Sequence, residues 1–250
     1  AYRGGHLTEW EQQQRAHERL RELGFRVRMS AYEGGPSGFG LRANSPEEDR
    51  AGEIYGKSLA MGTAVFDAWL DAWRLGWTHQ CYLSFGQGKW WSSHTSRSDG
   101  HRPSPGWLAL KLINHHLANL DMLKVDVQGA PTLEAEPKSR GRRTQDRGRL
   151  EVPAITAHAF GDGRRFAVAL ANLHLSEPQT VEIRVPVAAA ARIEWHYLAG
   201  DPRQTNLEAL NITLQSRTLD AGLLRDGRLE QTLPPGSAGV LVVDAALPRG

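Results

Sequence analysis

One carboxylate, Glu33, stands at a position suited to chemistry. Apolar and polar residues alternate from residue 25 to residue 30, and this period of two predicts a strand. The strand runs into Tyr32 and Glu33 and stops there, because the following Gly34-Gly35-Pro36 sequence cannot continue a ladder. In barrels of alternating strands and helices, catalytic groups lie at such strand ends. Glu33 is therefore either a catalytic carboxylate or a hydrated loop residue.

The segments around this strand alternate between helix and strand through the first half of the chain. Helix starts are predicted at Thr8, Ser45 and Ser104, which are favoured N-cap residues. The helix after Ser45 is expected to run to about Leu75, and a second strand is predicted over residues 79–85. This order predicts a parallel sheet with crossover connections. Two strands are too few for such a sheet, so we expect the closing part of a larger α/β barrel.

A polar loop over residues 86–103 follows the second strand and contains Trp90, Trp91 and His94. Adjacent tryptophans can stack on sugar rings, which present C–H faces to aromatic planes. The alternative is one tryptophan in the core and the other exposed.

The remainder of the chain has a different character. Residues 138–149 carry six Lys or Arg against one Asp, which predicts a solvated or mobile tract that trypsin cleaves easily. The tract lacks the interleaved aromatics of a nucleic-acid surface. After residue 153, seven short strand-like runs separated by turn signals predict a β-sandwich.

Composition excludes several classes of protein. The net charge of the 250 residues is +2, which gives no strong field for nucleic acid or an anionic membrane. The sequence contains no run of about 18 apolar residues, so no membrane span is predicted. The single cysteine, Cys81, allows no internal disulfide and is expected to be buried. His115 and His116 are adjacent and lack the spacing of a helical metal pair, so neither a metal nor a cofactor is predicted.

The order of elements resembles the C-terminal half of a clan A glycoside hydrolase. The motifs that carry the resemblance are Tyr32-Glu33-Gly34-Gly35, Leu83-Ser84-Phe85-Gly86 and the Trp90-Trp91 pair. The resemblance implies a fold that combines an α/β part with an all-β part.

Three segments follow from the resemblance. Residues 1–125 would close a (β/α)₈ barrel, residues 126–152 would form a basic loop or linker, and residues 153–250 would form an antiparallel β-sandwich domain. By analogy, the location would be secreted or periplasmic.

The implied activity is hydrolysis of O-glycosyl bonds with retention of configuration, with Glu33 as the nucleophile. Tyr32, Trp90, Trp91 and His94 would bind an oligo- or polysaccharide or glycoside substrate. An ionised nucleophile needs hydrogen-bond donors, for which Tyr32, Arg28 and the backbone amides of Gly34 and Gly35 are the candidates.

The chain departs from this pattern in one respect. A retaining glycosidase needs a second carboxylic acid about 5–5.5 Å from the nucleophile. In this superfamily that residue follows an Asn, and the chain contains no Asn-Glu pair. We therefore expect a second polypeptide or a missing N-terminal segment to complete the barrel.

The alternative from a different class is a non-catalytic carbohydrate-binding or interaction module built on the sandwich. Such a module needs exposed aromatic side chains, and Trp195 and Tyr197 are the pair that shares a strand face.

Overall fold

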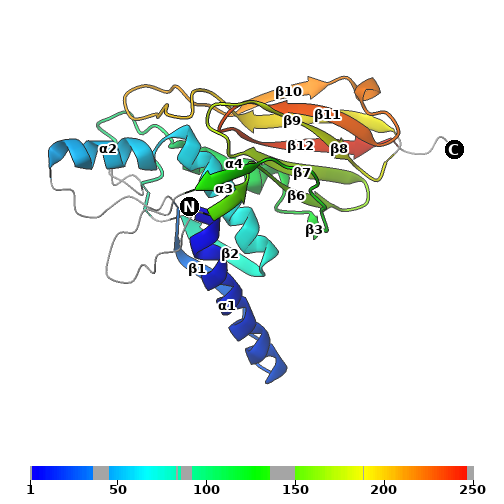
Figure 1. Ribbon diagram of the computed structural model, residues 1–250, viewed down its shortest axis with the longest axis horizontal. Coiled ribbons are helices and arrows are strands. Elements are labelled where there is room, and N and C mark those ends of the chain that lie inside the picture. Colours follow the sequence, from blue (N-terminus) through cyan, green and yellow to red (C-terminus); the bar gives the residue numbers. More distant parts are fainter. Residues whose placement is uncertain are drawn as a thin grey trace.

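The computed structural model describes residues 2–35, 45–82, 84–85, 92–135, 150–187 and 189–246. Its first part contains α1 (Tyr2–Glu22), β1 (Met29–Gly34), α2 (Pro46–Gly56), α3 (Leu59–Arg74), β2 (Trp77–Tyr82) and α4 (Pro105–His116). Strands β1 and β2 pair in parallel, as the sequence predicted. Helix α1 projects away from the rest of the molecule (Figure 1).

The second part is dominated by a six-stranded antiparallel sheet with the order β10-β9-β12-β7-β6-β3. Its strands are β3 (Asp121–Leu123), β6 (Ile155–Gly161), β7 (Arg165–Asn172), β9 (Ala190–Leu198), β10 (Gln215–Leu219) and β12 (Ala238–Ala245). Two further antiparallel pairs are β8 (Gln179–Arg184) with β11 (Arg228–Leu233), and β4 (Thr132–Ala135) with β5 (Leu150–Pro153). A short 3₁₀ helix, η1 (Ala221–Leu223), precedes β11. All seven strands predicted after residue 153 are present.

The large sheet is the middle of three layers. Helices α3 and α4 cover one of its faces, and the β8–β11 pair covers the other (Figure 1). Along β7, Ala167 and Ala169 belong to the core on the helix side, whereas Val168 and Leu170 belong to the core on the other side. This alternation follows from the period of two in a strand. The small alanines allow the helices to pack closely on the sheet.

The single helix predicted from Ser45 to about Leu75 is broken in the structure. Ser58 has an extended backbone, and its side chain caps α3 by accepting a bond from the Met61 N–H. The N–H groups of Leu59 and Ala60 donate to the loop carbonyls of Gln204 and Pro202, at 2.9 Å each. These tertiary bonds satisfy the first amides of a new helix, which outweighs the local preference for continuing the old one.

Two other boundaries differ from the prediction. Helix α1 begins at Tyr2, so Thr8 lies inside the helix and is not its N-cap. Gly24 ends the helix with a φ of +87°, and the Phe25 N–H bonds to the Leu20 carbonyl at 3.0 Å, as in a Schellman motif. Strand β1 starts only at Met29, where pairing with β2 begins, and Phe25 is 57% exposed.

The expectation for Cys81 is wrong, because this residue is exposed. The Gln80 side chain bonds to the Trp69 carbonyl and the Tyr82 ring contacts Trp69, so these two β2 residues face α3. Cys81 lies between them in sequence and therefore points to the opposite face.

The three predicted segments can be compared with these elements. Strand β3 lies within residues 1–125 yet pairs with β6, so the chain joins the large sheet before residue 125. The basic tract, residues 138–149, lies outside the described residues. Among the described helices, none is long and apolar enough to cross a membrane.

Candidate active site

Glu33 lies at the carboxyl end of β1, as predicted, but the strand is irregular there. Ala31 pairs with Gln80 and Gly34 pairs with Tyr82, so β1 has one more residue than β2 between these pairs. Such a bulge interrupts the alternation of side chains. As a result Glu33 and its neighbour Tyr32 are both exposed, and Tyr32 has 86% of its surface accessible.

The donors suggested for Glu33 are not in place within the described residues. In that part of the chain neither Tyr32 nor Arg28 makes a hydrogen bond or ion pair with the Glu33 carboxylate. The carboxylate can therefore accept hydrogen bonds from a substrate or from another part of the protein.

Glycine is favoured at each of the two positions after Glu33 for a different structural reason. A Cβ atom on Gly34 would lie 2.9 Å from the Trp69 ring and 3.2 Å from the Cys81 carbonyl oxygen, so glycine allows β1 to approach α3. Gly35 has a φ of +136°, a conformation that disfavours other residues. Close packing and chain direction thus explain these glycines without a ligand.

The neighbouring strand ends in a packed tyrosine. The Tyr82 ring lies 5.8 Å from the Trp107 ring in an edge-to-face contact and 6.4 Å from the Trp69 ring. Its hydroxyl is 3.4 Å from Ser104 Oγ, and burial raises the pKa of Tyr82 to about 12. Tyr82 is therefore a neutral structural side chain beneath the strand end.

Strain follows directly after β2. Ser84 has a φ of +67°, which costs about 1–3 kcal/mol for a residue with a side chain. Its Oγ atom is buried and has no hydrogen-bond partner in the described part of the chain. Strain of this kind persists only where the surroundings impose it and often marks functional sites.

An aromatic cluster gathers beyond this strained residue. It consists of Phe85, His94, His101 and Trp107. The His94 and His101 rings stack at 4.6 Å, and Phe85 lies 4.9 Å from His94 and 5.3 Å from His101. Burial lowers the pKa of His94, and the charge of His101 lowers it further. Phe85 is 65% exposed, so part of the cluster faces solvent.

The loop that carries His94 and His101 is folded back on itself. The Thr95 N–H bonds to the Arg102 carbonyl at 2.9 Å, and the Ser104 N–H bonds to the Ser93 carbonyl at 2.7 Å. This pairing brings the two histidines together, although six residues separate them in sequence.

The same loop is anchored to the second part of the molecule. The Arg102 guanidinium donates to the backbone carbonyls of Asn206, at 2.8 Å, and Leu207. Asn206 in turn donates to the Pro103 carbonyl at 2.8 Å. The loop between β9 and β10 therefore helps to fix the position of the aromatic cluster.

The predicted site residues can now be placed. Tyr32 and Glu33 lie in the last residues of β1, and His94 lies in the loop that follows the neighbouring strand β2. Trp90 and Trp91 lie outside the described residues. Sequence reasoning missed Phe85, His101 and Trp107 as neighbours of His94, because the contacts arise from the fold of the loop and not from spacing. Among the described residues, no group of His, Cys, Asp and Glu side chains is arranged to hold a metal ion.

Comparison with known proteins supports the fold. No family model and no curated protein matches the chain. The α-L-arabinofuranosidase of Thermotoga maritima superposes with a TM-score of 0.58 at 19% identity, over 86% of this chain and 42% of that one. The family 51 α-L-arabinofuranosidase of Thermotoga petrophila gives a TM-score of 0.58 at 17% identity, over 86% and 43%.

A xylanase of glycoside hydrolase family 30 is also similar in structure. This enzyme, from Clostridium acetobutylicum, gives a TM-score of 0.50 at 13% identity, over 86% of this chain and 49% of that one. The chain thus has the fold of part of these clan A glycoside hydrolases, which confirms the resemblance seen in the sequence at the level of fold. It spans less than half the length of each of these enzymes.

Proposed function

We propose that this chain is part of a retaining glycoside hydrolase in which Glu33 is the nucleophile. The observation that carries the proposal is the exposed Glu33 carboxylate at the carboxyl end of a parallel strand, in a chain with the fold of glycoside hydrolases. In such a reaction Glu33 attacks the anomeric carbon while the glycosidic bond breaks and the acid/base carboxyl protonates the leaving oxygen. Water, deprotonated by the same acid/base group, then displaces Glu33 and releases the sugar. Tyr32, Trp90, Trp91 and His94 are the proposed substrate-binding residues.

The barrel is part of the same proposal. Strands β1 and β2, with α1, α3 and α4, would be its closing part, and residues 126–152 and 153–250 would be the linker and the β-sandwich domain. The face of β2 opposite α3 supports this arrangement, because Cys81 and His79 are exposed there, on the side where further barrel strands would enclose them.

The proton donor would come from outside this chain. Because the sequence has no Asn-Glu pair, the acid/base carboxyl is assigned to a preceding segment or a second polypeptide. The substrate would be an oligo- or polysaccharide or a glycoside. We propose arabinofuranosides and xylans as the first to be tested, since these are the sugars in the names of the similar enzymes.

The alternative, a non-catalytic carbohydrate-binding module, is less well supported. Of the pair that would form its aromatic platform, Trp195 is 1% exposed and packs in the core between the large sheet and the β8–β11 pair, and Tyr197 is partly buried against the same core.

The decisive experiment uses protein that contains this chain together with the segment that completes the barrel. Glu33→Gln should lower turnover of an activated aryl arabinofuranoside or xyloside by at least about a thousandfold, while sugar binding and melting temperature stay unchanged. Near-full activity of this variant would rule out Glu33 as the nucleophile. The isolated 250-residue chain is expected to be inactive, because the proton donor is absent from it.

Azide distinguishes a nucleophile from a residue with another role. In Glu33→Ala, azide should restore part of the turnover of the activated substrate and give a product of inverted configuration, because the small anion occupies the space of the missing carboxylate. Loss of activity without rescue would assign Glu33 a structural or acid/base role.

A further inference from the structure

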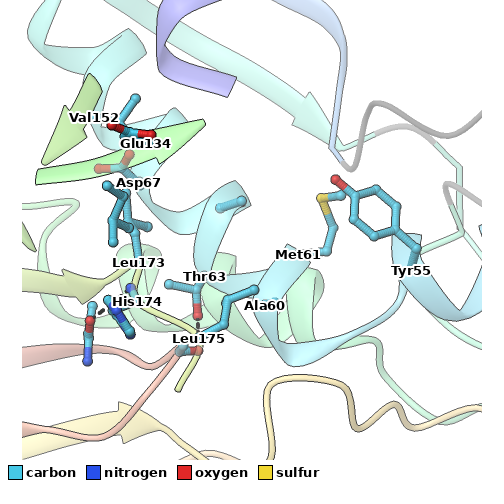
Figure 2. Close-up of a pocket in the computed structure, with 14 residues that line it drawn as sticks. Tyr55, Ala60, Met61, Thr63, Asp67, Glu134, Val152, Leu173, His174 and Leu175 are labelled. Atoms are coloured by element: carbon cyan, nitrogen blue, oxygen red, sulfur yellow. Dashed lines mark hydrogen bonds between the residues drawn. The ribbon is translucent and has the colours of Figure 1, made fainter. Parts of the chain in front are cut away.

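A cavity lies apart from the strand ends that carry Glu33 and His94. Its volume is about 420 Å³, within the usual range for small-molecule sites of roughly 300–1,000 Å³. It is bounded by the first half of α3, the β4–β5 pair and residues 172–175 at the end of β7 and just beyond it (Figure 2). No residue of β1, β2 or the aromatic cluster lines it.

The cavity has acidic groups at one end and an aromatic side chain at the other. Figure 2 shows Asp67 and Glu134 together at one end, with Tyr55 and Met61 at the other. Asp67 is 1% exposed, and its Oδ1 atom is 3.7 Å from Nε2 of the buried His158. An ionised carboxylate has about four acceptor positions, so each of these groups can accept a ligand hydroxyl in addition to its partners in the protein.

A donor is supplied by His174. Its Nδ1 atom accepts hydrogen bonds from the backbone N–H groups of Glu177, at 2.9 Å, and Ser176, at 3.3 Å. Because Nδ1 accepts these bonds, the ring carries a proton on Nε2. Glu177 Oε2 lies 3.6 Å from Nε2, which is beyond a normal hydrogen bond. A ligand oxygen in the cavity can thus receive a bond from His174.

Between these polar groups the lining is apolar. Met61, Leu173 and Ala64 line the cavity, and the Tyr55 ring is half exposed at its rim. A ligand that fits must offer hydroxyl donors to carboxylates, an oxygen acceptor to an imidazole N–H, and C–H groups to an aromatic ring and a thioether. A neutral sugar ring has all three properties, whereas a simple cation would leave the His174 donor unused.

We propose that this cavity binds a short neutral oligosaccharide, as a second carbohydrate site separate from the Glu33 centre. The Tyr55 ring packs on the C–H face of one sugar unit, Asp67 and Glu134 accept hydroxyl protons from another unit toward the opposite end, and His174 Nε2 donates to a ring or hydroxyl oxygen. The site does not depend on the proposed catalytic role of Glu33.

The test is saturation-transfer NMR and calorimetric titration of the 250-residue protein with the neutral disaccharides xylobiose and cellobiose, with choline chloride as a cationic competitor. Both sugars should receive saturation from the protein. Tyr55→Ala should weaken sugar binding about tenfold, whereas Tyr55→Phe should keep it within about twofold, because the ring is retained.

A second variant removes the donor without disturbing the loop. His174→Asn keeps an oxygen near the Nδ1 position for the Ser176 and Glu177 amides but loses the Nε2 proton. It should weaken binding by about two- to tenfold. Leu223→Ala, at an exposed residue of η1 outside the cavity, is the matched control and should bind as the parent does.

Three results would overturn the proposal. They are an absence of saturation transfer to both sugars, displacement of the sugars by choline, and binding that Tyr32→Ala abolishes while Tyr55→Ala leaves it unchanged. The last result would place the sugar at the Glu33 strand end. Because Tyr55 and Tyr32 are both well exposed, neither substitution is expected to unfold the protein.

Discussion

Two histidines face each other where α4 meets β9. The rings of His116 and His196 stack with their centroids 3.9 Å apart and their planes 19° from parallel. Burial and the neighbouring charges of His196, His115 and Arg165 lower the pKa of His116 to about 4. Burial also lowers the pKa of His196, although Glu194 opposes this shift. At neutral pH both rings are uncharged and can remain stacked.

Acid should therefore destabilise this contact. In the unfolded chain His116 has its ordinary pKa of 6.5, so between about pH 6.5 and about pH 4 the unfolded state binds more protons than the folded state. Stability from neutral His116 is complete above about pH 6.5 and is lost as the pH falls toward 4. We expect His116→Asn to reduce the fall in urea midpoint between about pH 7 and about pH 4.5.

The control is His79→Asn, at an exposed histidine of β2. It should show the same pH dependence as the parent protein. An unchanged slope in His116→Asn would mean that the stacked pair does not contribute to acid sensitivity.

The Glu33 position shows how far single residues were predictable. Alternation and the following glycines placed Glu33 at a strand end, which the structure confirms. They could not reveal the bulge, because an extra residue between Ala31 and Gly34 leaves no mark in the order of apolar and polar residues. Pairing with the neighbouring strand determines to which face of the sheet a side chain at a strand end points.

At the scale of elements, the loop of residues 92–104 depends on Asn206. This side chain is 2% exposed and makes four hydrogen bonds. It donates to the carbonyls of Pro103 and Ile212 and accepts from the N–H groups of Asn211 and Ile212. One buried amide thus holds a turn of the second part of the molecule and joins it to the loop after β2.

Removal of this amide should have two effects. Asn206→Ala leaves buried backbone groups without partners, each at a cost of about 1–3 kcal/mol, so we expect at least about 2 kcal/mol less stability in urea unfolding. The loop should also loosen, which would appear as shifted and broadened imidazole NMR signals of His94 and His101. Asn211→Ala, which loses one exposed bond to the Thr205 carbonyl, should cost less than about 1 kcal/mol and leave these signals in place.

A comparable loss of stability in both variants would contradict this assignment. So would unchanged histidine signals in Asn206→Ala, because the loop would then be held by other contacts.

Elements were predictable where local pattern and tertiary packing agree. Ser45 and Ser104 cap their helices as predicted, each by accepting an amide N–H three residues later. Predictions failed where a side chain outside the element forms hydrogen bonds with backbone groups that the element would otherwise use. The sequence pattern predicts a strand over residues 211–219, but β10 starts at Gln215, because the Asn206 side chain binds the amides of Asn211 and Ile212.

At the scale of the whole molecule, the helices and the large sheet share one core. Leu70 and Phe66 of α3 and Leu112 of α4 belong to the same buried cluster as Phe160 and Val240 of the sheet. Each of these side chains is at most 1% exposed. The helices of the expected barrel part and the sheet of the expected sandwich part therefore share a buried cluster. Separation of the helices from the sheet would expose this apolar surface to water.

The shared core predicts a single unfolding transition. Hydrogen exchange measured by mass spectrometry in increasing urea should show α3 and β12 losing protection at the same denaturant concentration, because both bury side chains in the cluster. Leu70→Ala should lower both midpoints together, by about 2–5 kcal/mol in free energy of unfolding. Leu223→Ala, at an exposed site, should leave both within about 0.5 kcal/mol of the parent. If β12 stayed protected in urea that had already unfolded α3, the two parts would be independent domains and the shared core would be a weak interface.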